Sequence, residues 1–503
     1  MISAKELAHY GALGYARVPV VREVLADFDT PVSAYQKVAA GPFSYLFESV
    51  QGGEQRGRYS IIGLPAKEVL RVANGKVTLT NATGTSTQAT ENPLAFIEAY
   101  RQRFVCPEIP GLPRFNGGLV GYFSYDSATY FLPELNLGSG EDTLGVPDIL
   151  LMRSEEVVVF DNLRGSLFFI VLVDPKQQDA LAQAEQRIDQ LQDKLRQPLP
   201  EQPLQAIAEP LDETDFVSEF PAPKFKAAVT YLQEKITQGE VEQVVPSQRM
   251  SVAFDADPMS LYRALRHLNP SPYMYYLDLD DFHIAGSSPE ILSRVEQGVV
   301  TVRPIAGTRP RGKTAEEDAL MEQELLADPK EVSEHEMLID LGIEDIAKLA
   351  DEDTIEVTDR MMVERYSHVM HLVSNVSGRL REGESLIDVL RVTLPAGTLS
   401  GAPKLRAMEL IDEVEPVKRG IYGGAIGYMG FNGGMDQAIA IRTAIIKEGR
   451  LYLQAGAGVV ADSVAESEWQ ETLNKGRAIF AAVNMVLRGL TPEQAVLAAT
   501  KEK

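Results

Sequence analysis

Three motifs between residues 394 and 478 decide the fold: LPAGTLSGAPKLRAMELID (394–412), GIYGGAIGYMGFNGGMDQAIAIRTAII (420–446) and LQAGAGVVADSVAESEWQETLNKGRA (453–478). The first motif is a glycine-rich loop that leads into a helix. The second contains Asn432-Gly433, a strong hairpin signal between two apolar runs, and Glu448-Gly449 shortly after it predicts a second turn. The three motifs therefore predict a helix, a β-meander and a final helix.

The final helix carries Glu468, Glu471 and Lys475 on one face, because their spacing of three and four residues matches the helical period. Upstream, Glu331 and Glu334 have the same spacing near the start of another predicted helix. Taken alone, either set is more often a solvated, salt-bridged surface. Two such pairs on two helices supply the hard oxygen ligands that Mg²⁺ takes, with positions left for water and substrate.

Composition excludes several classes of protein. The 503 residues include 72 acidic and 48 basic side chains, a net charge of −24, which argues against nucleic-acid binding. No apolar run reaches the ~18 residues of a membrane helix, and the N-terminus resembles neither a signal nor a transit peptide. The single cysteine, Cys106, excludes an intrachain disulfide. We therefore expect a protein of the reducing cytoplasm, without a membrane or nucleic-acid partner.

Many short strands with helices segregated from them favour an α+β fold over a doubly wound sheet. A segment rich in Pro and acidic residues, 197–223, lacks periodicity and reads as a linker. We expect an N-terminal domain at 1–196, a catalytic domain at 224–490 and a C-terminal tail at 491–503. Residues 1–42 are expected to form a helix and then an irregular segment.

The combined motifs PIAGTRPRG, SEHEMLIDL, VMHLVS, GTLSGAPK, GGAIGY, AIRTA, AGAGVVADS and EWQETLNKGRA are highly specific. With them the chain resembles the chorismate-utilising enzymes, most closely the large, aminating subunits of anthranilate synthases (component I). The resemblance spans the chain and is strongest from Phe225 to Val486. It implies two large, mostly antiparallel sheets packed face to face, with helices outside. It also implies conversion of chorismate and ammonia to anthranilate, pyruvate and water.

By this resemblance, Mg²⁺ binds Glu334 and Glu471 directly and grips the ring carboxylate of the substrate, while Glu331 and Glu468 hold metal-bound waters. Mg²⁺ usually keeps several waters, so two direct protein ligands suffice. The metal, a few cations and backbone N–H groups must attract the chorismate dianion locally, because the overall charge repels it.

The resemblance assigns Glu290 as the acid that protonates the leaving C4 oxygen. Burial beside apolar neighbours is expected to raise its pKa, as a general acid at neutral pH requires. His371 is implied either in proton transfer or in holding the leaving oxygen; a histidine among apolar residues is otherwise most often a core residue. We expect His368 and His371 to share one helical face. The other substrate contacts implied are Gly307, Thr308, Thr398, Tyr422, Arg442, Gly456, Ala457, Gly458 and Lys475.

Two positions discriminate within the family. Aminodeoxychorismate synthases typically read PIKGT, with a nucleophilic lysine, where this chain has Ala306. Isochorismate and salicylate synthases carry a lysine base where this chain has Gln243; an amide cannot deprotonate water, but it can accommodate ammonia. Both positions favour anthranilate as the product. The alternatives are an aminodeoxychorismate synthase and a catalytically dead chorismate-binding subunit; the second is disfavoured by the intact set of acids and bases.

Family members of this kind take ammonia from a separate glutamine amidotransferase subunit (component II), and no amidotransferase module is evident in this sequence. The stretch LFES (46–49), followed by Arg58, resembles the family's motif for feedback inhibition by L-tryptophan. An amino acid needs an acceptor for its ammonium, donors for its carboxylate and an apolar slot for its indole. The residues expected to provide these are Glu48, Ser49, Arg58, Pro272, Tyr273, Met274, Ile426 and Tyr428.

Overall fold

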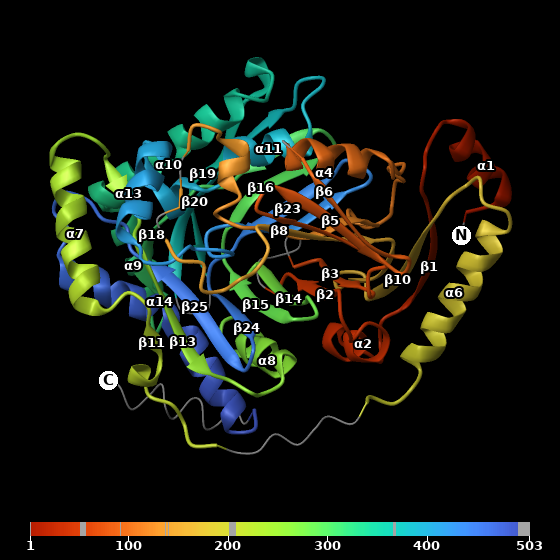
Figure 1. Cartoon of the computed structure of the whole chain (residues 1–503), viewed down its shortest axis with the longest axis horizontal. Coiled ribbons are helices and arrows are strands. Elements are labelled where there is room, and N and C mark those ends of the chain that lie inside the picture. The colour runs from red at the N-terminus through yellow and green to blue at the C-terminus, as the bar shows by residue number, and fades with distance from the viewer. Residues whose placement is uncertain are drawn as a thin grey trace.

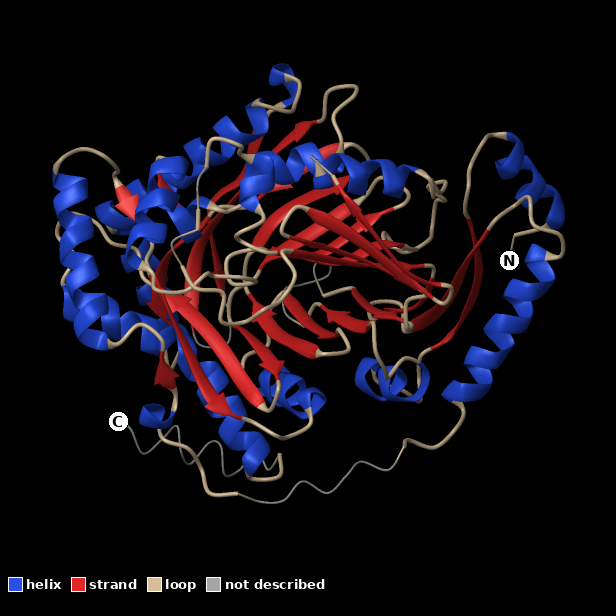
Figure 2. Ribbon diagram, in the orientation of Figure 1, coloured by secondary structure: helices blue, strands red, loops and turns tan. Residues whose placement is uncertain are grey.

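Two large antiparallel β-sheets form the body of the molecule, with helices on their outer faces (Figures 1 and 2). The computed structural model describes residues 2–50, 57–90, 92–135, 137–138, 140–200, 208–365 and 369–490. All pairings between named strands in these residues are antiparallel, which confirms the α+β class and the two-sheet architecture expected from the sequence.

The first sheet has eleven strands in the described residues. Their order is β1 (Val18–Leu25), β10 (Ser166–Val173), β9 (Glu156–Asp161), β3 (Tyr59–Gly63), β2 (Ser44–Glu48), β14 (Tyr273–Asp278), β15 (Phe282–Ser288), β24 (Thr443–Lys447), β25 (Arg450–Gly456), β13 (Ser247–Ala253) and β11 (Val217–Ser218). At its centre β2 pairs with β14, with Glu48 opposite Met274, so segments on both sides of residues 197–223 share one sheet.

The second sheet has twelve strands within the same ranges. The order is β18 (Ile305–Pro310), β20 (Val369–Arg379), β17 (Val299–Val302), β16 (Ile291–Glu296), β23 (Met435–Ile439), β22 (Ala425–Gly430), β7 (Gly118–Phe123), β8 (Ile149–Ser154), β4 (Glu68–Ala73), β5 (Lys76–Asn81) and β6 (Gly84–Ala89), and β19 (Glu356–Arg365) also pairs with β20. Here β7 pairs with β22, again across the linker. The predicted domain boundaries remain a prediction. Each sheet contains strands from both the proposed N-terminal and the proposed catalytic domain.

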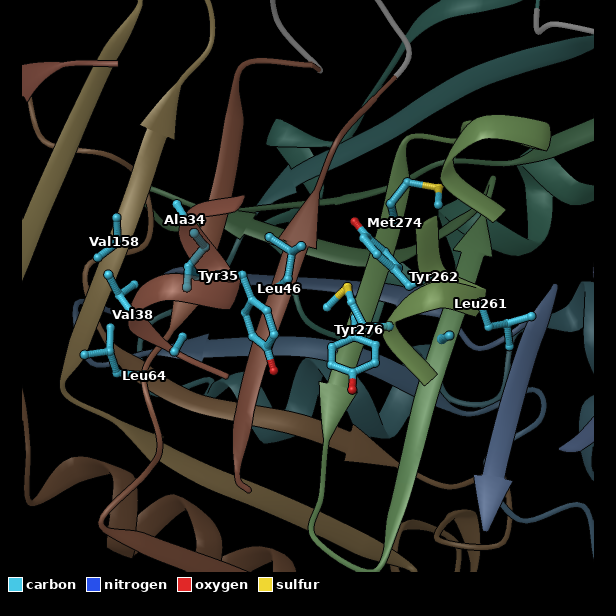
Figure 3. Close-up of a cluster of buried hydrophobic side chains, with 14 of the residues drawn as sticks. Ala34, Tyr35, Val38, Leu46, Leu64, Val158, Leu261, Tyr262, Met274 and Tyr276 are labelled. Atoms are coloured by element: carbon cyan, nitrogen blue, oxygen red, sulfur yellow. The ribbon is translucent and has the colours of Figure 1, made fainter. Parts of the chain in front are cut away.

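Three apolar layers hold this arrangement together. The middle layer lies between the sheets and includes Tyr45 and Tyr275 of the first sheet and Tyr122 and Tyr428 of the second. An outer layer lies between the first sheet and α1 (Ala4–Ala12), α2 (Pro31–Val38), α6 (Ala180–Leu195), α8 (Pro258–Leu268) and α14 (Ala465–Leu487). Figure 3 shows side chains of α2, β2, β14 and α8 that meet in this layer.

The other outer layer lies between the second sheet and α4 (Pro93–Gln102), α10 (Pro329–Ala347) and α11 (Leu386–Thr393). The helix α9 (Ala315–Ala327) lies beside β18 and β20. The helices α7 (Ala222–Thr237) and α13 (Lys404–Val414) pack with α14 around a smaller core. The remaining elements are the short helices α5 (Ala128–Phe131) and α12 (Gly397–Ser400), the 3₁₀ turns Glu213–Asp215 and Glu352–Thr354, and a two-stranded ladder of β12 (Gln243–Val244) and β21 (Gly401–Ala402).

The predicted turn at Glu448-Gly449 is confirmed. It joins β24 and β25, and both residues have the positive φ of a tight hairpin turn, 50° and 71°. Two expectations were wrong. Residues 1–42 contain the additional strand β1 and helix α2, and His371 lies in the strand β20, not on a helix. His368 and the tail at 491–503 lie outside the described residues.

Candidate active site

A cavity of about 470 Å³ gathers the motifs that dominate the sequence. Its walls come from β12, from β18, from α10, α12 and α14, and from the loop that precedes α14. The predicted site residues that line it are Gln243, Gly307, Thr308, Glu331, Glu334, Thr398, Gly458, Glu468, Glu471 and Lys475. Residues more than 200 positions apart in the chain are therefore brought to one site.

The helices α10 and α14 present the four glutamates. Asp328 caps α10 by accepting hydrogen bonds from the N–H groups of Lys330 and Glu331, and Pro329 fits the first helical turn. Glu331 and Glu334 follow within one turn of each other on the cavity side. The two glutamate pairs predicted from their spacing, one on each helix, thus line the same cavity.

Cations hold part of this acidic set. Lys475 lies 2.7 Å from Glu471 Oε1, and its ammonium also donates to the carbonyl of Gly456 at 2.9 Å. Arg309 binds Glu331 at 3.1 Å. Burial, and then the charge of Glu331, raise the pKa of Glu334, and burial likewise raises the pKa of Glu468. The cavity therefore holds partly desolvated carboxylates that a cation would stabilise.

The donor set fits a Mg²⁺ ion that keeps several waters. Among the described His, Cys, Asp and Glu side chains, no group of three or more is close enough together to hold a metal. The chemistry nevertheless suits the ion, because hard carboxylate oxygens from two helices line one cavity and the remaining positions are open to water. Glu331, Glu334, Glu468 and Glu471 are the acidic residues of this lining that could hold the ion and its waters.

Glu290 does not line this cavity, but its carboxyl group lies next to it and is hydrogen-bonded to the lining residue Thr398. Burial raises its pKa to about 7, although the hydrogen bond from Thr398 and the charges of Lys475 and Arg442 act in the opposite direction. The Thr398 hydroxyl donates to Glu290 Oε1 at 3.0 Å. Glu290 therefore retains a proton to a higher pH than an ordinary glutamate, which suits a general acid.

His371 contacts the cavity wall through its ring. Its Nδ1 lies 2.8 Å from the carbonyl oxygen of Gly307 and 3.2 Å from Thr308 Oγ1. Burial lowers the pKa of His371, so the ring is neutral at pH 7. A carbonyl only accepts hydrogen bonds, so Nδ1 carries the proton and Nε2 is the basic nitrogen of the ring. The ring is set to accept a proton or a hydrogen bond at Nε2.

Arg442 and Tyr422 do not line this cavity but lie near the acids Glu290 and Glu471. Arg442 has a φ of 50°, an uncommon conformation for a residue with a side chain, and no described residue forms an ion pair with it. Burial lowers its pKa, and the phenol of Tyr422 and the carboxylates of Glu471 and Glu290 lie near enough to counter that effect. An unpaired guanidinium in such surroundings is suited to bind a carboxylate on two N–H groups.

The glycines at the end of β25 allow close approach. A Cβ atom on Gly456 would lie 2.8 Å from the Tyr422 hydroxyl, and one on Gly458 would lie 2.7 Å from Gln243 Nε2. Ala457, between them, is buried and its N–H donates to the carbonyl of Pro246. Side chains at 456 and 458 would therefore displace two polar groups that border the cavity.

Sequence reasoning missed four polar residues that line the cavity: Lys330, Asp462, Ser463 and Ser467. Lys330 adjoins Glu331, and the other three lie in or just after the motif AGAGVVADS, so proximity to the motifs was the available signal. Ala306 lies between the cavity-lining Ile305 and Gly307, at an irregularity in the pairing of β18 with β20.

A second cavity, also of about 470 Å³, lies between the two sheets. All eight residues predicted for the inhibitor pocket line it: Glu48, Ser49, Arg58, Pro272, Tyr273, Met274, Ile426 and Tyr428. Two of their charged groups already have partners. The Glu48 carboxylate binds Tyr262 and Arg266 and its side chain is 1% exposed, and Arg58 binds Asp161 at 2.7 Å. The backbone around Glu48 and the Ser49 side chain are thus better placed than the Glu48 carboxylate to meet a ligand.

Comparison with known proteins agrees with this geometry. The family model of the chorismate binding enzymes matches residues 44–481. The anthranilate synthase component 1 of Pseudomonas putida is 54% identical over 484 residues, which cover 96% of this chain and 98% of that protein. The same component of Neisseria meningitidis serogroup B is 54% identical over 497 residues, covering 97% and 100%.

Solved structures show the same fold. The anthranilate synthase component I of Streptococcus pneumoniae TIGR4 matches with a TM-score of 0.76 at 36% identity, covering 91% of this chain and 99% of that one. The menaquinone-specific isochorismate synthase of Escherichia coli matches with a TM-score of 0.67 at 18% identity, a likeness of fold. The chain belongs to the chorismate-binding enzymes, in the group of the anthranilate synthase component 1 proteins. In the described ranges, no helix combines the length and apolarity that crossing a membrane needs.

Proposed function

We propose that this chain is the synthase component of an anthranilate synthase, which converts chorismate and ammonia to anthranilate, pyruvate and water in the first step of tryptophan biosynthesis. The observation that carries the proposal is the acid Glu290, whose pKa is raised to about 7, beside a cavity that Lys475 lines; Lys475 and the nearby Arg442 supply positive charge for an anionic substrate. The relatives that share at least half of its sequence are named for this activity.

In the first half of the reaction, ammonia forms a bond to C2 of the ring and the C4–oxygen bond breaks. Hydroxide is a poor leaving group, so Glu290 donates its proton to that oxygen, which departs as water. Thr398, hydrogen-bonded to Glu290, orients the acid. Gln243 lines the cavity as a neutral amide, so it positions ammonia by hydrogen bonding without removing a proton from it.

In the second half, the added nitrogen releases its extra proton, the hydrogen on C2 leaves as a proton and the C3–oxygen bond breaks as the ring becomes aromatic. The departing enolpyruvate takes up a proton to become pyruvate. This step needs a base. The neutral ring of His371 has its lone pair at Nε2, because Nδ1 is held by the carbonyl of Gly307. We assign His371 to this proton transfer.

Substrate binding must overcome a chain charge of −24. Arg442 and Lys475 supply cationic groups, and the glycines at 456 and 458 let backbone groups approach the substrate. When bound, Mg²⁺ supplies positive charge that grips the ring carboxylate of chorismate. Glu334 and Glu471 would hold it, and Glu331 and Glu468 would bind its waters.

A separate glutamine amidotransferase subunit is proposed as the ammonia source. The only cysteine in the sequence, Cys106, is buried, and burial raises its pKa to about 12. A thiol in this state is not a glutaminase nucleophile, which needs an accessible thiolate. A cytoplasmic location, where free thiols are stable, accords with this single cysteine.

L-Tryptophan is proposed to bind in the second cavity and thereby to inhibit the synthase reaction. Pro272, Met274 and Ile426 offer an apolar slot, while Ser49 offers a hydroxyl. The cavity is lined by strands of both sheets, so an occupant can favour one arrangement of them over another. Tryptophan and chorismate would then weaken each other's binding by the same factor.

The test uses the purified chain with chorismate, Mg²⁺ and an ammonium salt. Anthranilate is measured by its fluorescence and pyruvate by reduction with lactate dehydrogenase, and the two are expected in equal amounts. Glutamine should support the reaction only after an amidotransferase subunit is added. Formation of an amino-deoxychorismate without pyruvate release would favour the aminodeoxychorismate synthase alternative, and no turnover at all would favour a catalytically dead subunit.

A further inference from the structure

A buried ion pair joins Glu415 and Arg419, just after α13, next to the candidate active site. The two residues form a double hydrogen bond, with Arg419 Nε at 3.0 Å from Glu415 Oε2 and Nη2 at 2.6 Å from Oε1. Their side chains are 4% and 2% exposed. Removing both charges from water is costly, and the pair is retained only because further hydrogen bonds satisfy it.

The remaining donors of Arg419 bind two segments of the cavity wall. Its Nη1 donates to the carbonyl of Leu399 at 2.7 Å, and its Nη2 donates to the carbonyl of Val245 at 2.6 Å. Leu399 follows Thr398, the hydrogen-bond partner of the acid Glu290. Val245 lies two residues after Gln243, which lines the cavity. One guanidinium thus fixes the spacing between the acid side and the Gln243 side of the site.

Glu415 extends the same connection to a third segment. Its Oε1 accepts hydrogen bonds from the N–H of Ser247 at 2.7 Å and from the Ser247 hydroxyl at 2.8 Å. Ser247 pairs with Gly456 in the ladder of β13 and β25. The Glu415 carboxylate therefore ties Arg419 to the strand end that approaches the Tyr422 hydroxyl.

Tyr422 itself lies against the guanidinium. The Arg419 Cζ atom is 5.5 Å from the centre of the Tyr422 ring and 4.5 Å from that of Tyr125, so the cation contacts two aromatic faces. Burial alone would lower the pKa of Arg419, and the Glu415 carboxylate more than reverses this effect. A lysine ammonium is a single point charge and cannot bind a carboxylate and two separate carbonyls in this planar pattern.

We propose that Arg419, held by Glu415, is a positioning residue that aligns Thr398, Gln243 and Tyr422 around the substrate. It touches none of the reacting atoms and acts through the backbone of the segments that carry these side chains. The inference rests on the proposed function, because it concerns the acid and the ammonia side of that reaction.

A specific consequence separates positioning from a merely structural role. The hydrogen bond from Thr398 lowers the pKa of Glu290. If the carbonyl of Leu399 is released, the neighbouring Thr398 hydroxyl loses its fixed distance to Glu290, and the pKa of the acid rises. Since the acid works in its protonated form, the loss of activity at alkaline pH then begins at a higher pH.

The experiment compares Arg419→Lys with the wild-type chain in ammonia-dependent turnover, from pH 6 to pH 9. We expect kcat to fall about 10- to 100-fold, because a misplacement on the order of 1 Å has this effect, with a smaller change in the KM for chorismate. The alkaline limb should move to higher pH, in the same direction as in Thr398→Val. A double variant, Arg419→Met with Glu415→Met, removes both buried charges. It should not restore kcat to the wild-type value, even if it folds as stably as the wild type.

Arg101→Lys is the matched control. Arg101 is also buried, with a side chain 6% exposed; it binds a glutamate of its own helix, Glu98, and donates to a backbone carbonyl, that of Gly430, but it lies on α4, outside the cavity wall. This variant should lose thermal stability without a shift of the alkaline limb. If Arg419→Lys does not fold, Glu415→Gln, which keeps the shape of the pair, should show the same shift to a smaller extent.

The outcomes distinguish the two proposals. A wild-type chain that forms no anthranilate would overturn the proposed function, whatever the variants do. An active wild type, together with an Arg419→Lys variant whose kcat and alkaline limb match those of Arg101→Lys, would overturn the positioning role and leave the function intact.

Discussion

At the scale of single residues, the catalytic power of the site depends on how burial tunes ionisable groups. Glu290 and His371 illustrate the two directions. Desolvation disfavours the charged form, so it raises the pKa of the carboxyl group to about 7 and lowers the pKa of the imidazole. One environment thus yields a proton donor and a proton acceptor that coexist at neutral pH, as the two halves of the proposed reaction require.

The first prediction concerns Glu290→Gln. The amide cannot donate the proton to the leaving oxygen, so kcat should fall by about 10²- to 10⁴-fold. In the wild type, kcat should decline as the pH rises through about 7, because the acid becomes deprotonated. Stopped assays of anthranilate from pH 6 to pH 9 check both points. Glu352→Gln, an exposed change remote from the site, should keep the wild-type profile; retention of full activity by Glu290→Gln would refute the assignment.

The same raised pKa predicts a dependence of stability on pH. A glutamate exposed to water in the unfolded chain has a pKa of 4.5, so between pH 4.5 and about 7 the folded state retains a proton that the unfolded state releases. The free energy of unfolding should therefore decrease across this window by the contribution of Glu290. Urea unfolding of the wild type and Glu290→Gln at pH 5 and pH 8 checks this. Relative to the wild type, the free energy of unfolding of Glu290→Gln should be higher at pH 8 than at pH 5. If this relative stability is the same at both pH values, Glu290 is not a buried, protonated acid.

At the scale of elements, two of the helices that line the cavity supply its glutamates. Since α10 and α14 each carry a pair within one turn, neither helix forms the site alone. Glu334→Gln should weaken binding of Mg²⁺ by at least about tenfold, because a charged oxygen ligand is replaced by a neutral one. Calorimetric titration with Mg²⁺ measures this without relying on activity.

Glu336→Gln is the control for this prediction. Glu336 lies on the same helix but forms an ion pair with Arg360. Its variant should bind Mg²⁺ like the wild type. Equal affinities for the Glu334 and Glu336 variants would remove Glu334 from the metal site.

The strand β2 and the residue that follows it connect the sheet to the second cavity. Ser49→Phe should relieve inhibition by L-tryptophan, because the larger ring occupies the cavity, while uninhibited activity stays largely intact. Rates at increasing tryptophan concentration measure this. Thr87→Phe, on the exposed strand β6, should remain as sensitive as the wild type. A Ser49→Phe variant with the wild-type inhibition curve would mean that the inhibitor binds elsewhere.

At the scale of the whole molecule, both sheets combine early and late segments of the chain. Arg266 of α8 binds Glu48 of β2 at 2.9 Å and thereby ties the two halves together beside the second cavity. Arg266→Ala should destabilise the fold by about 3 kcal/mol, at the lower end of the range for buried pairs because Arg266 is 37% exposed. Urea unfolding measures this loss.

A double variant provides the control for the Arg266 prediction. Glu48→Gln together with Arg266→Met removes both charges, so it should be less destabilised than Arg266→Ala, which leaves a buried carboxylate with Tyr262 alone. If Arg266→Ala were as stable as the wild type, the pair would contribute nothing to joining the halves.

The sequence by itself determined the local elements and the types of residue in the site. The turn at Glu448-Gly449 and the final helix, Ala465–Leu487, follow from turn chemistry and helical periodicity, which depend on neighbours within a few positions. The spacing and the surrounding motifs of four acids can be recognised in the sequence without a structure: Glu331, Glu334, Glu468 and Glu471. Resemblance to a family then supplied roles that spacing alone does not give.

Only the tertiary structure decided which distant segments meet and which partners the side chains choose. Local patterns did not predict β1 and α2, whose burial depends on packing against β10 and α6. Glu48 was expected to bind a ligand, yet its carboxylate binds Arg266, 218 residues away. Arg419 gave no signal in the sequence, because its role arises from carbonyl groups of two other segments. Long-range hydrogen bonds and desolvation depend on the folded arrangement, and no local pattern records them.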